Sequence, residues 1–319
     1  MAADSVRALS VGIVALALGA ALGASDGLDG SRSAFGIGVL RRDGVIIPFG
    51  AFDGKRWTNS WPQPALELTI PIGLRGVPSK WWGPTGPLET WQVWPSGEPQ
   101  RVSVVQTDWV NVHCVRQIGL RSDYTPPAAP PPRTAQPYPK DGLAVSPPQP
   151  VERVAVVPAE SADTRALLPA LRDAFNTAER KTEDRYHHPM TRRSREGRDP
   201  DIEAVYAAGD HPRVYYIEAV RRYRQLGQRP DECEAVAFGA GWFVREGTDI
   251  RSLETVVDLL ECSRAGAGYM LPLGVMRIAG RMFWLAQFSG WAHERFVVVE
   301  IKPKAVEAVL SVWGGSCQS

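Results

Sequence analysis

The sequence predicts a mainly β fold with a minor α component, built as two β-rich domains joined by a proline-rich linker. Three observations predict it. Apolar runs rich in Val, Ile, Trp and Tyr recur before and after the middle of the chain, and helical spacing is rare. Ten of the 27 prolines fall within residues 125–150. The 319 residues also exceed the roughly 250 to 300 at which single cores stop growing. We therefore expect domains over 25–124 and 151–319.

Residues 8–24 are an uncharged run that predicts a signal peptide or an N-terminal anchor, so we assign 1–24 to that role. As a helix the run would span only about 25 Å, less than the roughly 30 Å hydrocarbon core. Small residues near Ala24 allow cleavage, whereas Asp4 cancels the charge of Arg7 and leaves a retained anchor open. We expect an extracytoplasmic protein, periplasmic, cell-surface or secreted, that contacts a membrane only if residues 8–24 are retained.

The first domain, 25–124, is predicted to be all β. Its clearest unit is a hairpin from Gly38 to Gly54, in which Asp43-Gly44 is a turn pair and the glycine supplies positive φ. Further strands are expected at 66–70, 90–94, 101–106 and 110–118. The hairpin aligns without gaps on 274–290, which indicates either a duplicated module or two hairpins that follow the same turn rule.

The stretch 125–150 should be a semi-extended linker, because proline removes backbone donors and fixes φ. After it, the spacing of Leu167, Leu171 and Phe175 predicts an amphipathic helix over 162–181, weakened at its start by Pro169.

Aromatic and β-branched runs then predict strands at 214–223, 233–245, 269–278, 281–290 and 294–301, although 214–223 also fits a helix. A short C-terminal helix is predicted from Pro303 in its first turn to Gly314 just past its end, with Val306, Leu310 and Trp313 on one face.

The chain has four cysteines, an even number that predicts two disulfides in an exported protein. We favour a bond between Cys233 and Cys262, which closes a loop of about thirty residues within one β-rich block. Cys114 and Cys317 either form the second bond or are free and buried. No two cysteines have the C-x-x-C spacing of zinc or thiol redox sites.

The charge balance and the motifs exclude several classes of function. A net charge of +1 gives no overall field for nucleic acid, so we expect no nucleic-acid partner. The sequence has no G-x-S-x-G elbow, no H-E-x-x-H zinc motif and no phosphate-binding loop. We therefore expect neither a metal nor a cofactor, and we lean towards a protein that is not an enzyme.

Tryptophan is the feature most open to a functional interpretation, because seven of the eleven fall within 53 residues. Exposed rings stack on sugars or form hot spots for partner proteins. The candidate ligand-binding residues are Trp57, Trp61, Trp81 and Trp82. One of Trp81 and Trp82 is expected to be exposed, since the pair lies in a Gly/Pro-rich turn. The alternative is that these rings pack in a small β core.

Three hypotheses for function follow. The first is a non-enzymatic exported protein that acts through surface binding, or as an envelope or extracellular assembly component, with a protein or glycan partner at the cell envelope. The second is a secreted polysaccharide hydrolase that uses tryptophan stacking and a carboxylate pair drawn from Asp53, Glu67, Glu89 and Asp108. The third is a membrane-tethered accessory subunit anchored by residues 8–24.

Overall fold

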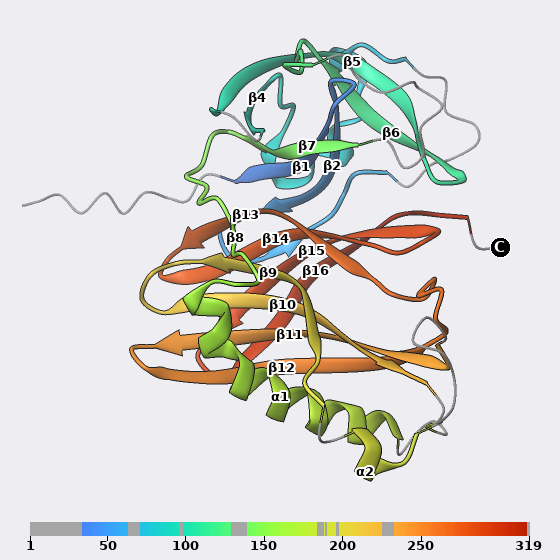
Figure 1. The fold of residues 1–319 in the computed structure, drawn as a ribbon. Helices are drawn as coiled ribbons and strands as arrows, with labels where there is room; N and C mark the ends of the chain where they lie inside the picture. The colour runs from blue at the N-terminus through green and yellow to red at the C-terminus, as the bar shows by residue number, and fades with distance from the viewer. Residues whose placement is uncertain are drawn as a thin grey trace, which may run out of the picture. The chain divides into compact units, whose positions relative to one another are not determined.

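The computed structural model in Figure 1 confirms the mainly β class. It describes residues 34–62, 71–95, 98–128, 139–183, 188, 190–195, 198–224 and 233–317. The predicted signal peptide or anchor and the strand expected at 66–70 lie outside these residues. Contacts group Arg32–Ser319 into one compact unit, so the division at residue 125 into two domains stays a prediction.

The first sheet has seven strands in the order β1-β7-β4-β5-β6-β2-β3, and an additional antiparallel pairing of β1 with β2 closes it on itself. Its strands are β1 (Phe35–Arg41), β2 (Val45–Phe52), β3 (Trp57–Thr58), β4 (Thr90–Trp94), β5 (Gln100–Val112), β6 (Val115–Ser122) and β7 (Lys140–Ser146). Two 3-10 segments, η1 (Leu74–Gly76) and η2 (Ser79–Thr85), lie between β3 and β4. The predicted hairpin is β1–β2, and Gly44 has φ 80° in its turn.

Strand β7 corrects the prediction of a linker over 125–150. Lys140–Ser146 pair with β1 on one side and β4 on the other, so this part of the stretch completes the closed sheet. Leu143 and Val145 have no exposed surface and belong to the core. Their burial offsets the conformational entropy that the segment loses when it becomes a strand. The prolines that mislead the prediction flank the strand and do not interrupt it.

Two further open sheets follow. A five-stranded sheet has the order β12-β11-β10-β9-β8, and a four-stranded sheet runs β13-β14-β15-β16. Their strands are β8 (Ala155–Val156), β9 (Asp201–Ala208), β10 (Arg213–Tyr223), β11 (Ala235–Glu246), β12 (Asp249–Leu260), β13 (Tyr269–Ile278), β14 (Arg281–Ser289), β15 (His293–Lys302) and β16 (Ala305–Ser316). The helices are α1 (Ala162–Glu183) and α2 (Arg192–Arg195). The ambiguous stretch 214–223 is a strand, as predicted.

The predicted C-terminal helix is wrong, because Ala305–Ser316 form strand β16. Pro303 lies in the turn between β15 and β16, and β16 pairs along its length with β15. Val312 packs in the core between sheets, where a β-branched side chain on a pleated surface is well accommodated. Pairing with the neighbouring strand therefore outweighs the local helical spacing.

The sheets stack in layers, which Figure 1 shows with α1 beyond the five-stranded sheet. One core fills the closed sheet, around Ile46, Trp91 and Leu120. The outer face of that sheet packs on the four-stranded sheet through residues such as Ile47 and Phe283. A third core joins the four-stranded and five-stranded sheets, and a fourth joins the five-stranded sheet to α1. Every sheet thus has an apolar face that another element covers.

Helix α1 follows the predicted amphipathic pattern. Ser161 Oγ accepts a hydrogen bond from the Thr164 N–H at the helix start, a standard N-cap interaction. Leu167, Leu171 and Phe175 are buried against the five-stranded sheet. A Cβ at Gly239 of β11 would lie 2.4 Å from the Phe175 ring, so this glycine allows the close approach of helix and sheet.

Two disulfides are present, Cys233–Cys262 and Cys114–Cys317. The first is the pairing that the sequence favours, and the second shows that the other two cysteines are not free. Disulfides of this kind indicate an oxidising, extracytoplasmic environment. Among the residues that the structure describes, no helix combines the length and apolarity that a membrane crossing requires.

The two similar hairpins have different settings. Gly44 and Gly280 both adopt positive φ in their turns, at 80° and 75°. Strand β1, however, has β7 as its second neighbour, whereas β13 lies at the edge of its sheet. This difference favours two hairpins that follow the same turn rule over a duplicated module.

Candidate functional site

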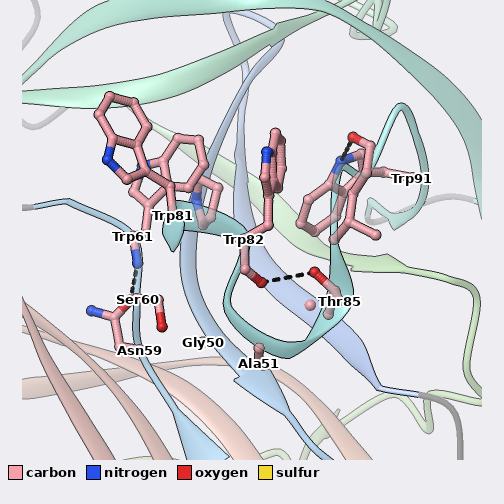
Figure 2. Close-up of a pocket in the computed structure, with 12 residues that line it drawn as sticks. Gly50, Ala51, Asn59, Ser60, Trp61, Trp81, Trp82, Thr85 and Trp91 are labelled. Carbon is pink, nitrogen blue, oxygen red and sulfur yellow. Dashed lines mark hydrogen bonds between the residues drawn. The ribbon is translucent and has the colours of Figure 1, made fainter. Parts of the chain in front are cut away.

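Three of the four candidate tryptophans, Trp61, Trp81 and Trp82, line one cavity, which Figure 2 shows. The rings of Trp61 and Trp81 lie edge to face with centroids 5.6 Å apart, and the centroids of Trp61 and Trp82 are 5.3 Å apart. The exposure expected for one of Trp81 and Trp82 is wrong, because η2 turns both rings inward and they keep 6% and 4% of their surface. The fourth lining tryptophan is Trp91.

The size and lining of the cavity limit what it can hold. Its volume of about 20 Å³ is enough for about one water molecule, far below the several hundred Å³ of a typical ligand pocket. Trp61 Nε1 donates to the Ile118 carbonyl at 2.7 Å, whereas Trp82 Nε1 is buried without a partner. None of the lining residues is acidic. In this arrangement the cavity fits a water molecule and has no room for a sugar ring.

Trp57 is separated from the other three candidates. It lies on β3 and packs edge to face on Phe35 and Phe283, so it belongs to the core between the closed sheet and the four-stranded sheet. The ring is 7% exposed. This tryptophan therefore has the packing role that the sequence left open as the alternative.

The two exposed tryptophans are not among the four candidate ligand-binding residues. Trp291 lies in the turn between β14 and β15 and is 83% exposed, and Trp313 on β16 is 41% exposed. The other nine tryptophans are buried or half-buried. One signal was available in the sequence, since Trp291 follows Gly290 between two apolar strand patterns and so falls in a turn.

We define an aromatic surface as Trp313 with its neighbours His293 and Arg295, together with Trp291, which lies two residues before His293 in the adjoining turn. Arg295 and Trp313 are cross-strand partners, with the guanidinium carbon 5.8 Å from the ring centroid. The His293 ring lies parallel to Trp313 with centroids 6.3 Å apart. This surface combines planar rings with one cation on adjacent strands.

The turn that carries Trp291 is held in place by the end of the chain. The Gly290 N–H donates to the His293 carbonyl at 2.9 Å, which closes the turn. The Cys317 N–H donates to the Ala292 carbonyl at 2.7 Å, and Cys317 is bonded to Cys114. A hydrogen bond and a disulfide thus fix the backbone on which the aromatic surface stands, which lowers the conformational entropy lost on binding.

A buried polar cluster lies between α1 and β10, centred on Glu179. Its carboxylate accepts hydrogen bonds from Arg221 Nη1 at 2.8 Å and from the Tyr223 hydroxyl, and His188 Nε2 lies 3.3 Å away. His188 Nδ1 accepts from the Met190 N–H, and burial lowers the pKa of the imidazole. Because Glu179 is 2% exposed and well partnered, the cluster joins helix to sheet and offers no accessible reactive group.

Two of the four carboxylates considered for a hydrolase have local partners, and Glu89 is exposed just before the start of β4. Asp53 accepts from the Lys55 and Arg56 N–H groups in a turn, and Asp108 pairs with Arg121. Glu67 lies outside the described residues. Within the described part of the chain, no three His, Cys, Asp or Glu side chains are placed to hold a metal ion.

Comparison with known proteins finds no family model, no curated protein and no solved structure that matches this chain.

Proposed function

We propose that this chain is an exported binding protein that docks a protein partner at the cell envelope through the aromatic surface. The observation that carries the proposal is the exposure of Trp291, which leaves 83% of its surface in water while nine other tryptophans are buried or half-buried. Tryptophan and arginine are the residues most enriched at binding hot spots. When a partner covers a large apolar ring at the tip of a fixed turn, the burial of the ring stabilises the complex.

The chemistry of the surface favours a protein over a glycan. A sugar stacks on a free ring face, whereas the Trp313 ring already has Arg295 and His293 beside it. A protein interface accepts the mixed set of two indoles, an imidazole and a guanidinium, with the apolar rings at its centre and the charge at its rim. The two disulfides support export, and the envelope as the place of action is part of the proposal.

A polysaccharide hydrolase has less support at the predicted site. The cavity beside Trp61, Trp81 and Trp82 has no acidic lining residue, whereas hydrolysis of a glycosidic bond needs two facing carboxyl groups.

Site-specific photo-crosslinking in the producing cells tests the proposal. A benzophenone amino acid replaces Trp291 in the full chain, and a second variant carries it at Val105, an apolar residue on β5 that is 61% exposed. We expect one crosslinked protein at position 291 that is absent at position 105, and whose yield falls when Trp313→Ala is added. Equal crosslinking at both positions, or none at 291, would refute a docking role for this surface.

A further inference from the structure

Four buried polar side chains from four segments meet beneath the aromatic surface. Lys140 comes from β7, His113 from the turn between β5 and β6, Gln287 from β14 and Glu294 from β15. The side chains of Lys140, His113 and Glu294 are 3%, 5% and 0% exposed, and Gln287 is buried as well. The closed sheet and the four-stranded sheet each contribute two residues. This is an amine, an amide, a carboxylate and an imidazole in a nearly dry site.

One carboxylate oxygen contacts both nitrogen groups. Lys140 Nζ donates to Glu294 Oε2 at 3.0 Å, and Gln287 Nε2 donates to the same oxygen at 3.1 Å. His113 Nε2 lies 3.8 Å from it. Glu294 therefore bridges an amine that can act as a nucleophile and an amide nitrogen that can act as a leaving group.

The cluster leaves polar atoms without partners. Glu294 Oε1, Gln287 Oε1 and His113 Nε2 are buried and make no hydrogen bond. A buried polar atom without a partner costs about 1 to 3 kcal/mol. Burial also lowers the pKa of the Lys140 amine, which favours its neutral, nucleophilic form. As separate side chains, these buried polar groups therefore destabilise the folded state.

We propose that Lys140 and Gln287 condense to an intramolecular isopeptide bond, with Glu294 as the proton relay. Lys140 Nζ attacks Gln287 Cδ, so that an Nζ–Cδ bond forms and the Cδ–Nε2 bond breaks. Glu294 Oε2 accepts the proton from Nζ and delivers it to Nε2, which leaves as ammonia. No oxidant, reductant or further reactant is needed, and the buried site excludes the water that would compete with the amine.

The bond would join the closed sheet to the four-stranded sheet. Strand β7 belongs to the first sheet and β14 is an inner strand of the second, so the covalent tie crosses their interface. The Cys114–Cys317 disulfide lies beside it, next to His113 in the chain and after β16. The isopeptide would persist under reducing conditions, in which the disulfide opens.

The test is mass spectrometry of the full-length protein after reduction and denaturation. We expect an intact mass about 17 Da below that of the reduced chain, equal to the ammonia released, and a protease digest with a branched peptide that contains Lys140 and Gln287. Lys140→Arg keeps the charge without the nucleophilic amine, and Glu294→Gln removes the relay. Both variants should show the unmodified mass.

Two results would overturn the proposal. One is unmodified Lys140 and Gln287 peptides in the digest of the wild-type protein, which needs no variant to fold. The other is a loss of about 18 Da with a branched peptide of Lys140 and Glu294, because that product releases water from a direct attack on the carboxyl group.

Discussion

Glu218 offers a quantitative test of how the sheets pack. It lies on β10, is 2% exposed, and its Oε1 accepts a hydrogen bond from the Met270 N–H of β13 at 2.6 Å. Burial between the five-stranded and four-stranded sheets raises the pKa of this carboxyl from 4.5 to about 7. We predict that Glu218→Gln removes a pH dependence of stability, because glutamine has the same size and its carbonyl oxygen can accept the same hydrogen bond.

The sign and size follow from the two pKa values. Below pH 4.5 the carboxyl is protonated in the folded and unfolded states. Between pH 4.5 and about 7 only the unfolded chain releases the proton, so the free energy of unfolding falls as pH rises. Well above pH 7 the loss is complete, at about 3.4 kcal/mol. Between pH 5 and 8 the loss amounts to about 2.5 kcal/mol.

Urea unfolding followed by tryptophan fluorescence, with the disulfides intact, measures this loss. Between pH 5 and pH 8 the free energy of unfolding of the wild-type protein should fall by about 2.5 kcal/mol more than that of Glu218→Gln. Glu300→Gln is a matched control, because Arg281 lowers the pKa of Glu300 below the usual 4.5. The ionised Glu300 therefore stabilises the fold by a nearly constant amount between pH 5 and pH 8, and this stabilisation is lost only as the pH falls below 4.5. An equal pH dependence in wild type and Glu218→Gln would refute the reasoning.

The remaining predictions concern the disulfides and the tryptophan cavity. Replacement of Cys233 and Cys262 by serine, which frees a loop with a sequence separation of 29 residues, should lower the free energy of unfolding by about 3.5 kcal/mol. The same change at Cys114 and Cys317, which are 203 residues apart, should lower the free energy of unfolding by about 5 kcal/mol. A smaller loss than for the first pair would contradict the loop-entropy argument. Trp61→Ala should lower the free energy of unfolding, measured in urea, by about 3 to 5 kcal/mol, because it removes a buried ring and its hydrogen bond to the Ile118 carbonyl. A loss below about 1 kcal/mol would show that the cavity wall is not part of the core.

The sequence predicted elements whose signals are local. The Asp43-Gly44 turn needs only a positive φ at one residue, and helix α1 needs only its cap and its apolar stripe. Strand β16 could not be predicted in this way. The spacing of Val306, Leu310 and Trp313 fits a helix face, but pairing with β15 decides the conformation, and that pairing is not encoded within the segment itself.

The candidate site was predicted from composition, which gives the density of tryptophans but not their exposure. Trp61, Trp81 and Trp82 do come together, yet η2 folds them inward around a water-sized cavity. Trp291 lies outside that cluster in the sequence and is the more exposed of the two exposed tryptophans. Exposure depends on what the rest of the fold covers, so a dense cluster favours mutual burial and an isolated ring in a tight turn is left in water.

The bond between Cys114 and Cys317 has a consequence for how the protein responds to a protease. It turns everything from residue 114 to residue 317 into a covalent ring that includes the five-stranded and four-stranded sheets. A protease that cuts one surface loop inside this ring opens it without releasing a fragment. The nicked protein would stay in one piece on a non-reducing gel. After reduction, a cut outside residues 140–287 would release a fragment, whereas the proposed isopeptide bond would still join the two sides of a cut within them. Damage to a loop therefore need not remove the aromatic surface from the rest of the molecule.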